Sequence, residues 1–195
     1  MDGFVALLAD IIRKAGAKDA AIFRDRALDL PGFFRPTKEW DLLVVVDGHL
    51  LAVIETKSQV GPSFGNNFNN RTEEAIGSAT DLWTAYREGA FDKSPRPWLG
   101  YLFLLEDCER SRSPVAVREP HFKVVEEFRD ASYARRYELL CRKLVRERHY
   151  EAAAFLTSHA DAGLKGVYAE PATDLTFRAF AASLSAHVSA YASLR

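Results

Sequence analysis

Two apolar runs separated by Asp47-Gly48 constrain the fold of this chain more than any other feature. The runs are DLLVVV, which starts at Asp41, and LLAVIE, which ends at Glu55, and Asp-Gly between such runs is a strong hairpin signal. Both runs are nearly continuous in apolar residues, a pattern typical of strands covered on both faces. The segment therefore predicts a β-hairpin inside a sheet that other elements cover.

The remaining patterns supply helices and further strands. Helical spacing of apolar residues predicts helices over 3–15, 70–89, 132–150 and 174–194, and apolar runs predict strands over 98–105 and 151–157. Residues 58–70 are rich in Gly, Asn and Ser and predict a loop, with Asn70 capping the next helix. We predict an α/β fold with a central mixed sheet flanked by helices. The length of 195 residues favours a single domain over 1–195.

Composition decides little about function but narrows the setting. The formal net charge of −1 is not that of an obvious nucleic-acid binder, although residues 56–71 contain no acid and offer local positive surface. The two cysteines, Cys108 and Cys141, lack the spacing of a zinc site or a disulfide framework. No window reaches the roughly 18 apolar residues of a membrane span. The sequence predicts a protein of a reducing cytoplasm without membrane attachment.

Three charged residues frame the hairpin. Asp41 opens the first strand, and Glu55 and Lys57 close the second. Antiparallel folding brings the two acids together, and residues two apart on a strand share a face. Two carboxylates at a strand end suit Mg²⁺, which polarises a phosphate and lowers the pKa of a bound water, while Lys57 orients that water or neutralises charge. Asp41, Glu55 and Lys57 are the candidate catalytic residues, and Asp41 and Glu55 the candidate metal ligands.

The alternative is a surface hairpin whose charged ends are merely solvated. Against it, the acids adjoin apolar runs and are expected beside a low-dielectric core. A shared metal also constrains the register, because a regular two-residue turn would place the carboxylates of Asp41 and Glu55 on opposite faces of the sheet. One extra residue brings them to the same face. We therefore predict a three-residue loop or an equivalent β-bulge around 47–49, with Gly48 at positive φ.

A longer block of the sequence resembles a known family. The stretches PGFFRPTKEWDLLVVV and AVIETKSQVGPSFGNNFNNRTEEAIGSATDLWTAYREGAF are similar to the XhoI family of type II restriction endonucleases. The resemblance runs from about Met1 to the C-terminal helix and is densest over 30–91. The three candidate catalytic residues match the PD-(D/E)XK positions one for one, with Trp40 where the motif has proline. Members of the family carry a segment before the MDGF start that is missing here.

The resemblance implies a restriction-endonuclease-like fold and Mg²⁺-dependent hydrolysis of double-stranded DNA at a palindromic hexamer, the family site being CTCGAG. A palindrome implies a homodimer in which each subunit cuts one strand. The family resemblance also implies a prokaryotic cytoplasm and a cognate DNA methyltransferase that forms no stable complex with the enzyme. Two alternatives stay open: a non-cleaving DNA-binding relative, and a PD-(D/E)XK repair nuclease without site specificity.

Polar residues near the predicted hairpin are the candidate DNA contacts. Asparagine pairs with adenine, and arginine with guanine or phosphate. The full set is Gln59, Asn66, Asn67, Asn69, Asn70, Arg71, Arg35 and Lys38. Turn formation and helix capping are the alternative for the Asn-rich run, and an exposed turn explains Arg35 and Lys38 equally well. Asp10 on the first helix is a further candidate acid, against the alternative of a solvated polar face.

Overall fold

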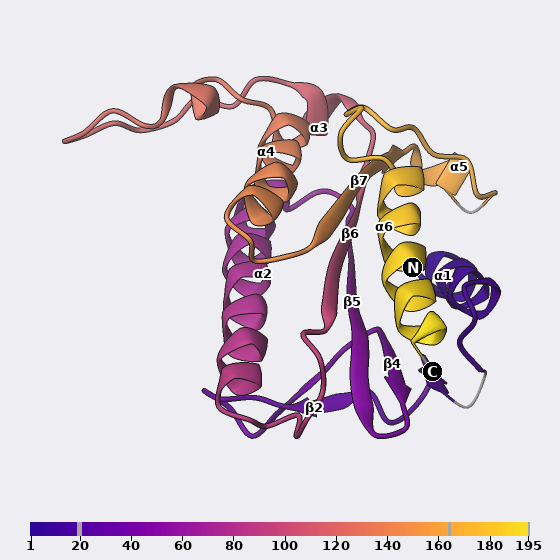
Figure 1. The fold of residues 1–195 in the computed structure, drawn as a ribbon. Helices are drawn as coiled ribbons and strands as arrows, with labels where there is room; N and C mark the ends of the chain where they lie inside the picture. The colour runs from indigo at the N-terminus through magenta and orange to yellow at the C-terminus, as the bar shows by residue number, and fades with distance from the viewer. Residues whose placement is uncertain (19–20, 164, 195) are drawn as a thin grey trace.

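The computed structural model describes residues 1–18, 21–163 and 165–194 and places a mixed β-sheet between two layers of helices (Figure 1). The five-stranded sheet has the order β1-β4-β5-β6-β7, and β2 and β3 form a separate two-stranded sheet. β4 is antiparallel to β1 and β5, whereas β5, β6 and β7 are parallel. The predicted α/β fold with a central mixed sheet is confirmed.

The elements follow the predicted order closely. The strands are β1 (Ile22–Phe23), β2 (Asp29–Pro31), β3 (Thr37–Glu39), β4 (Leu42–Val46), β5 (His49–Gln59), β6 (Trp98–Glu106) and β7 (Ala152–Ser158). The helices are α1 (Asp2–Lys14), α2 (Phe64–Arg87), α3 (Glu109–Arg112), the 3-10 turn η2 (Glu126–Phe128), α4 (Tyr133–Arg146), α5 (Ala160–Gly163) and α6 (Phe177–Ser193). None of the described helices is both long enough and apolar enough to cross a membrane.

Helices cover both faces of the sheet because its central strands are apolar on both. α2 and α4 pack on one face, and α1 and α6 pack on the other (Figure 1). Leu43 and Val53 point into the α2/α4 core, and Leu42 and Ile54 point into the α1/α6 core. The nearly continuous apolar pattern of the hairpin therefore follows from its central place, as predicted.

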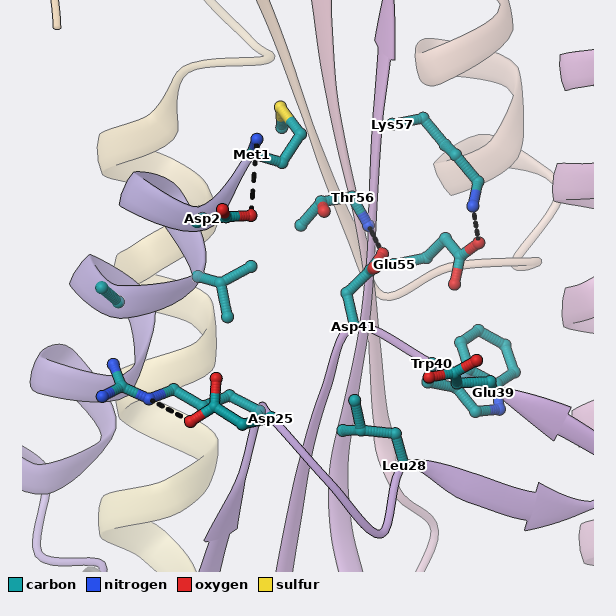
Figure 2. Close-up of a pocket in the computed structure, with 13 residues that line it drawn as sticks. Met1, Asp2, Asp25, Leu28, Glu39, Trp40, Asp41, Glu55, Thr56 and Lys57 are labelled. Carbon is teal, nitrogen blue, oxygen red and sulfur yellow. Dashed lines mark hydrogen bonds and ion pairs between the residues drawn. The ribbon is translucent and has the colours of Figure 1, made fainter.

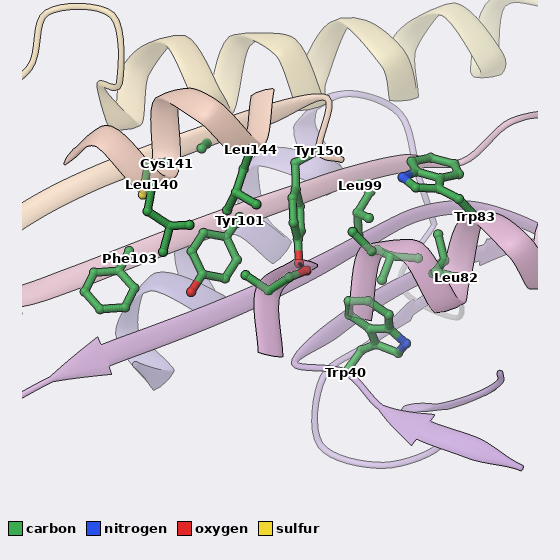
Figure 3. Packing of buried hydrophobic residues seen from close by; sticks show 14 of the residues in the cluster. Trp40, Leu82, Trp83, Leu99, Tyr101, Phe103, Leu140, Cys141, Leu144 and Tyr150 are labelled. Carbon is green, nitrogen blue, oxygen red and sulfur yellow. Dashed lines mark hydrogen bonds between the residues drawn. The ribbon is translucent and has the colours of Figure 1, made fainter. Parts of the chain in front are cut away.

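Aromatic rings fill the core between the sheet and α2 and α4. Tyr101 packs against Phe103 and Tyr150, with ring centroids 6.2 and 5.2 Å away (Figure 3). Phe103 also stacks on Tyr137, with ring centroids 4.2 Å apart. The Tyr150 hydroxyl donates to the carbonyl oxygen of Ala75 at 3.0 Å. This bond ties the start of β7 to α2 through the middle of the core.

A β-bulge sets the register between β4 and β5. The turn has two residues, Asp47 and Gly48, at φ +50 and +79, so Val46 pairs with His49. Between Val44 and Val45 the register shifts by one, and Leu51 is the extra residue. The predicted even register is thus confirmed, as is the positive φ of Gly48, but the bulge lies in the strand and not at the turn. A turn with positive φ at both residues matches the twist of the strands, so the extra residue is accommodated further along.

The bulge is fixed from the α1/α6 side. Leu51 and Ala52 are consecutive, yet both belong to that core, which is what an extra residue in one strand produces. Both side chains are almost fully buried there, so packing against α1 and α6 holds the extra residue in place.

The predicted loop over 58–70 is wrong. β5 continues to Gln59, and α2 already begins at Phe64, six residues before the predicted capping residue Asn70. Phe64 stacks on Tyr133 at 5.6 Å, and Phe68 meets the edge of Tyr137 at 5.1 Å. These contacts with α4 outweigh the low helix propensity of the Asn-rich run, because packing of one face dominates helix stability.

The segment between α3 and α4 projects from the rest of the molecule (Figure 1). Its two ends are joined by Arg136 on α4, which donates to the carbonyl oxygens of Val115 and Ala131, each at 2.9 Å. Phe122 in this segment is 88% exposed. Lys143 on α4 also pairs with Glu127 and lies over the Phe128 ring, so α4 holds the part of the segment that leads back to it.

The hydroxyls of Tyr101 and Tyr150 provide a matched pair for testing this core. Burial raises the pKa of both, but the Tyr101 hydroxyl has no hydrogen-bond partner among the described residues. Tyr101→Phe should leave the free energy of unfolding within about 0.5 kcal/mol of wild type or raise it, whereas Tyr150→Phe should lower it by about 1 kcal/mol. Urea unfolding of both variants measures the difference. A loss above about 1 kcal/mol at Tyr101 would contradict the packing described.

Candidate active site

The carboxylate of Glu55 is the centre of the site. Glu55 lies in the middle of the sheet on β5 and is only 4% exposed. Its Oε1 contacts the ammonium of Lys57 at 2.5 Å, and its Oε2 contacts the ammonium of Lys38 at 2.9 Å. A buried carboxylate is costly unless it is paired, and here each oxygen has a cationic partner. The predicted shared face of Glu55 and Lys57 is confirmed by their contact.

Asp41 stands directly before β4. The pairing of Leu42 with Ile54, continued by one residue, sets Asp41 opposite Glu55. Its backbone N–H donates to the carbonyl oxygen of Ile54 at 3.3 Å, and its Oδ2 accepts the N–H of Thr56 at 2.6 Å. Figure 2 shows the Asp41 side chain against β5, while the Glu55 carboxylate turns toward Lys57. The two acids are therefore neighbours across the two strands by register, and both line one cleft.

Both acids line a cleft of about 590 Å³. One wall is formed by the end of the sheet with Asp41 and Lys57, and the opposite wall is the first turn of α1 with Met1 and Asp2 (Figure 2). Asp25 and Leu28 line the cleft below Asp41 in this view. These walls could not be predicted from the sequence, because they reach the cleft only through the tertiary fold.

The two carboxylates suit a hard divalent cation such as Mg²⁺. Among the residues that the structure describes, no three His, Cys, Asp or Glu side chains are grouped to hold a metal ion, so a closed zinc site is not formed there. Mg²⁺ usually takes one or two protein carboxylates and completes its shell with water and substrate phosphate. Asp41 and Glu55 match that requirement, with the cleft on their open side.

The β2–β3 hairpin carries the two basic residues predicted ahead of Asp41. Arg35 lies at its tip, where its Nε donates to Oδ2 of Asp81 on α2 at 2.7 Å. The N–H groups of Phe33 and Phe34 donate to the other oxygen of Asp81 at 2.7 and 2.8 Å. Arg35 therefore binds α2 and lies outside the cleft, whereas Lys38 reaches the Glu55 carboxylate. The sequence did not predict this hairpin or the anchoring role of Asp81.

Asp81 is 3% exposed, and its charge is held by these contacts. Burial raises the pKa of its carboxyl, but the hydrogen bonds from Arg35, Phe34 and Phe33 together outweigh that effect and bring the pKa below its ordinary value of 3.8. A signal for Asp81 was present in the sequence, since an acid directly before Leu82 and Trp83 interrupts the apolar face of a helix.

The predicted Asn-rich contacts lie on a helix and not in a loop. The chain has four asparagines, and all of them fall in the first two turns of α2. Asn66, Asn69 and Asn70 are exposed and Asn67 is half-buried. Arg71 is half-buried and pairs with Glu74 at 2.5 Å. Spacing of three and four residues puts the exposed amides on one outward face.

Two further predictions are modified by the structure. Gln59 shares the strand face of Glu55 by alternation, but it is 3% exposed and its amide donates to the carbonyl oxygen of Val60. Asp10 does not reach the cleft: it is exposed on α1 and pairs with Arg13. The hypothesis of Asp10 as a third acid is therefore wrong, because the face of α1 that carries it points to solvent.

Comparison with known proteins identifies the family. Residues 1–170 match the family described as restriction endonuclease XhoI. The chain belongs to this family. Over 199 aligned residues it is 53% identical to the type II restriction enzyme BstVI of Geobacillus stearothermophilus, a match covering 100% of this chain and 89% of that relative.

Two other relatives in the XhoI family match over shorter spans. The type II restriction enzyme AbrI of Azospirillum brasilense is 64% identical over 124 residues, which cover 63% of this chain and 56% of AbrI. The type II restriction enzyme XhoI of Xanthomonas vasicola is 54% identical over 147 residues, which cover 74% of this chain and 59% of XhoI. No solved structure matches the chain.

Asp81→Asn should show how firmly the hairpin is held. At pH 7 the substitution should lower the free energy of unfolding by about 1–3 kcal/mol, because a buried charged acceptor of three hydrogen bonds is lost. The folded pKa lies below the ordinary value, so this stability is present above pH 4 and is lost as the pH falls through the folded pKa. Urea unfolding from pH 7 to pH 3 should show the wild type and the variant converging.

The exposed Asp161 on α5 provides the control for this series. Asp161→Asn should change the free energy of unfolding by less than about 0.5 kcal/mol throughout. A constant difference between Asp81→Asn and wild type across the pH range would show that the carboxylate charge is not what stabilises the hairpin.

Proposed function

We propose that this chain is a Mg²⁺-dependent type II restriction endonuclease that hydrolyses phosphodiester bonds in double-stranded DNA. The observation that carries the proposal is the buried Glu55 carboxylate, which has Asp41 beside it, Lys57 on one oxygen and an open cleft in front. Both cores of the fold are built on the five-stranded sheet that holds these residues, which supports the proposal that 1–195 form a single nuclease domain. Membership in the XhoI family supports the same activity.

The three residues divide the work in this proposal. Asp41 and Glu55 would hold Mg²⁺, which when bound would polarise the scissile phosphate and lower the pKa of a nearby water. Lys57 contacts Oε1 of Glu55, which restricts its rotamers. Its ammonium would therefore be in position when a phosphate enters the cleft. A preorganised cation at the place where negative charge develops stabilises the transition state.

Site specificity is assigned to the beginning of α2. Asn66, Asn69 and Asn70 present their amides outward, and asparagine can pair with adenine through two hydrogen bonds. Asn67 and Arg71 flank this face and are candidates for further base or phosphate contacts, as is Gln59 if it turns from Val60. Arg35 keeps part of its guanidinium exposed and remains a candidate phosphate contact at the hairpin tip.

The family site CTCGAG is the proposed target, and its palindromic sequence implies a homodimer with one catalytic cleft for each strand. In this setting the enzyme acts in a prokaryotic cytoplasm. A cognate DNA methyltransferase would protect the same sequence without forming a stable complex with it.

Digestion of a sequenced plasmid tests the proposal directly. With Mg²⁺, discrete fragments whose ends map to one hexamer are expected. Ragged fragments would favour a nuclease without site specificity. Retention of the plasmid in a gel-shift assay without cleavage would favour a non-cleaving DNA-binding relative. Either result would overturn the proposed function.

Glu55→Gln should abolish cleavage and retain DNA binding, because it removes a metal-ligand charge and no predicted phosphate contact. Lys57→Ala should reduce the cleavage rate by on the order of 10² or more if its ammonium stabilises developing charge. Single-turnover cleavage and gel-shift assays measure the two properties separately.

The control for this pair is Glu151→Gln, which neutralises an acid that pairs with Arg96 on the surface before β7. It should cleave at the wild-type rate. Near-wild-type cleavage by Glu55→Gln would remove Glu55 from the active site, and retained activity in Lys57→Ala would reduce Lys57 to a structural role.

Recognition is tested at Asn69, which is exposed on the outward face of α2. Asn69→Ala should weaken binding to the specific site by about 1–3 kcal/mol and leave binding to random DNA nearly unchanged. Thr80→Ala is the matched control, since Thr80 is exposed on the same helix about three turns further along. Equal losses on specific and random DNA would instead assign Asn69 to a phosphate contact or to helix folding.

A further inference from the structure

Lys38 is held at the catalytic carboxylate by three contacts. Its Nζ lies 2.9 Å from Oε2 of Glu55 and 2.9 Å from the carbonyl oxygen of Glu39. The same ammonium sits over the ring of Trp40, 4.0 Å from its centroid. The side chain is only 13% exposed. A lysine that is this enclosed and directed at a catalytic acid is not an ordinary surface cation, since lysine is rarely buried without a partner.

Lys38 is also not needed to attach its hairpin. The tip of the hairpin is fastened to α2 by the three hydrogen bonds to Asp81. Its other end is fastened where Trp40 donates to the carbonyl oxygen of Leu28 at 3.0 Å, and Trp40 itself is 3% exposed. The hairpin therefore does not depend on the contacts of the Lys38 ammonium, which can change partners while the hairpin stays in place.

The two lysines are not equivalent. Lys57 contacts Oε1 of Glu55 and lies two residues away on the same strand. Lys38 contacts Oε2 of Glu55 from the separate β2–β3 hairpin. A divalent cation bound to Oε2 of Glu55 would lie a few ångströms from the Lys38 ammonium. The two positive charges would repel each other, and this repulsion is strong in a partly buried site. Only one of them can hold Oε2 closely.

We infer that Lys38 competes with the divalent cation for Oε2 of Glu55 and, once displaced, contacts the DNA phosphate in the cleft. This inference rests on the proposed nuclease function and adds a second role for the β2–β3 hairpin. The flexible four-carbon stem of lysine allows its ammonium to move by several ångströms while the stem remains packed. Before the cation binds, the Lys38 ammonium neutralises Glu55. After the cation binds, the same ammonium contacts the DNA phosphate.

The inference predicts opposite changes in two measured properties. In DNA-free protein titrated with Mn²⁺, with the free ion followed by EPR, Lys38→Met should bind Mn²⁺ on the order of tenfold more tightly than wild type, because the competing cation is gone. At saturating Mg²⁺ the same variant should cleave DNA on the order of 10²-fold more slowly, because the phosphate contact is gone. Lys38→Arg keeps the charge and should keep the Mn²⁺ affinity near that of wild type.

Two further variants make the titration specific. Arg35→Met removes the other cation of the hairpin, whose carboxylate partner Asp81 lies outside the cleft, and should leave Mn²⁺ affinity unchanged. Glu55→Gln should lose the measured Mn²⁺ binding, which confirms that the titration reports this site. Circular dichroism and the unfolding midpoint establish that each variant is folded.

Other outcomes overturn the inference. If Lys38→Met binds Mn²⁺ with unchanged or weaker affinity, Lys38 does not compete for Glu55. If it binds Mn²⁺ more tightly and cleaves as fast as wild type, the phosphate contact is wrong. Failure of the wild type to cleave DNA would instead overturn the proposed function, and the Mn²⁺ titration in the absence of DNA would still decide the competition.

Discussion

The burial of one carboxylate explains much of how this protein is arranged. Glu55 is 4% exposed in the middle of the sheet, and a charge in such a place is stable only with close partners. Strand alternation delivers Lys57 to it, because the two residues share a face. The second partner, Lys38, requires a separate two-stranded hairpin that reaches back over the sheet and is fastened to α2 through Asp81. The hairpin and its anchor are thus part of the candidate active site.

The register that places Asp41 opposite Glu55 shows what chemistry can and cannot predict from a sequence. A shared metal requires an extra residue somewhere between the two acids, and the structure has one. Its position at Leu51 could not be predicted, because the Asp47-Gly48 pair is satisfied by a regular two-residue turn and nothing local marks Leu51 as the bulge. The packing of Leu51 and Ala52 into the same core decides the position.

The four longer strands and most helices were predictable because hydrophobic periodicity marks them, and the candidate catalytic residues were proposed from their fixed spacing around two of those strands. The start of α2 was not, since its asparagines have low helix propensity and the stabilising contacts come from Tyr133 and Tyr137 on α4. A trace of these contacts is present in the sequence, where Phe64 and Phe68 are four residues apart and Ala75 continues their face. The short strands β2 and β3 left no comparable pattern.

The position of α2 also bears on how recognition and cleavage are joined. Only residues 60–63 separate the end of β5 from the start of α2, so the exposed asparagines are connected to Glu55 and Lys57 through a short stretch of chain and two regular elements. Further along, α2 holds the tip of the hairpin that carries Lys38. A small displacement of α2 on binding bases would therefore reach Glu55 from both sides, through its own strand and through the lysine on Oε2. If the exposed asparagines contact bases as proposed, a coupling of this kind would give those contacts a direct effect on the Glu55 carboxylate.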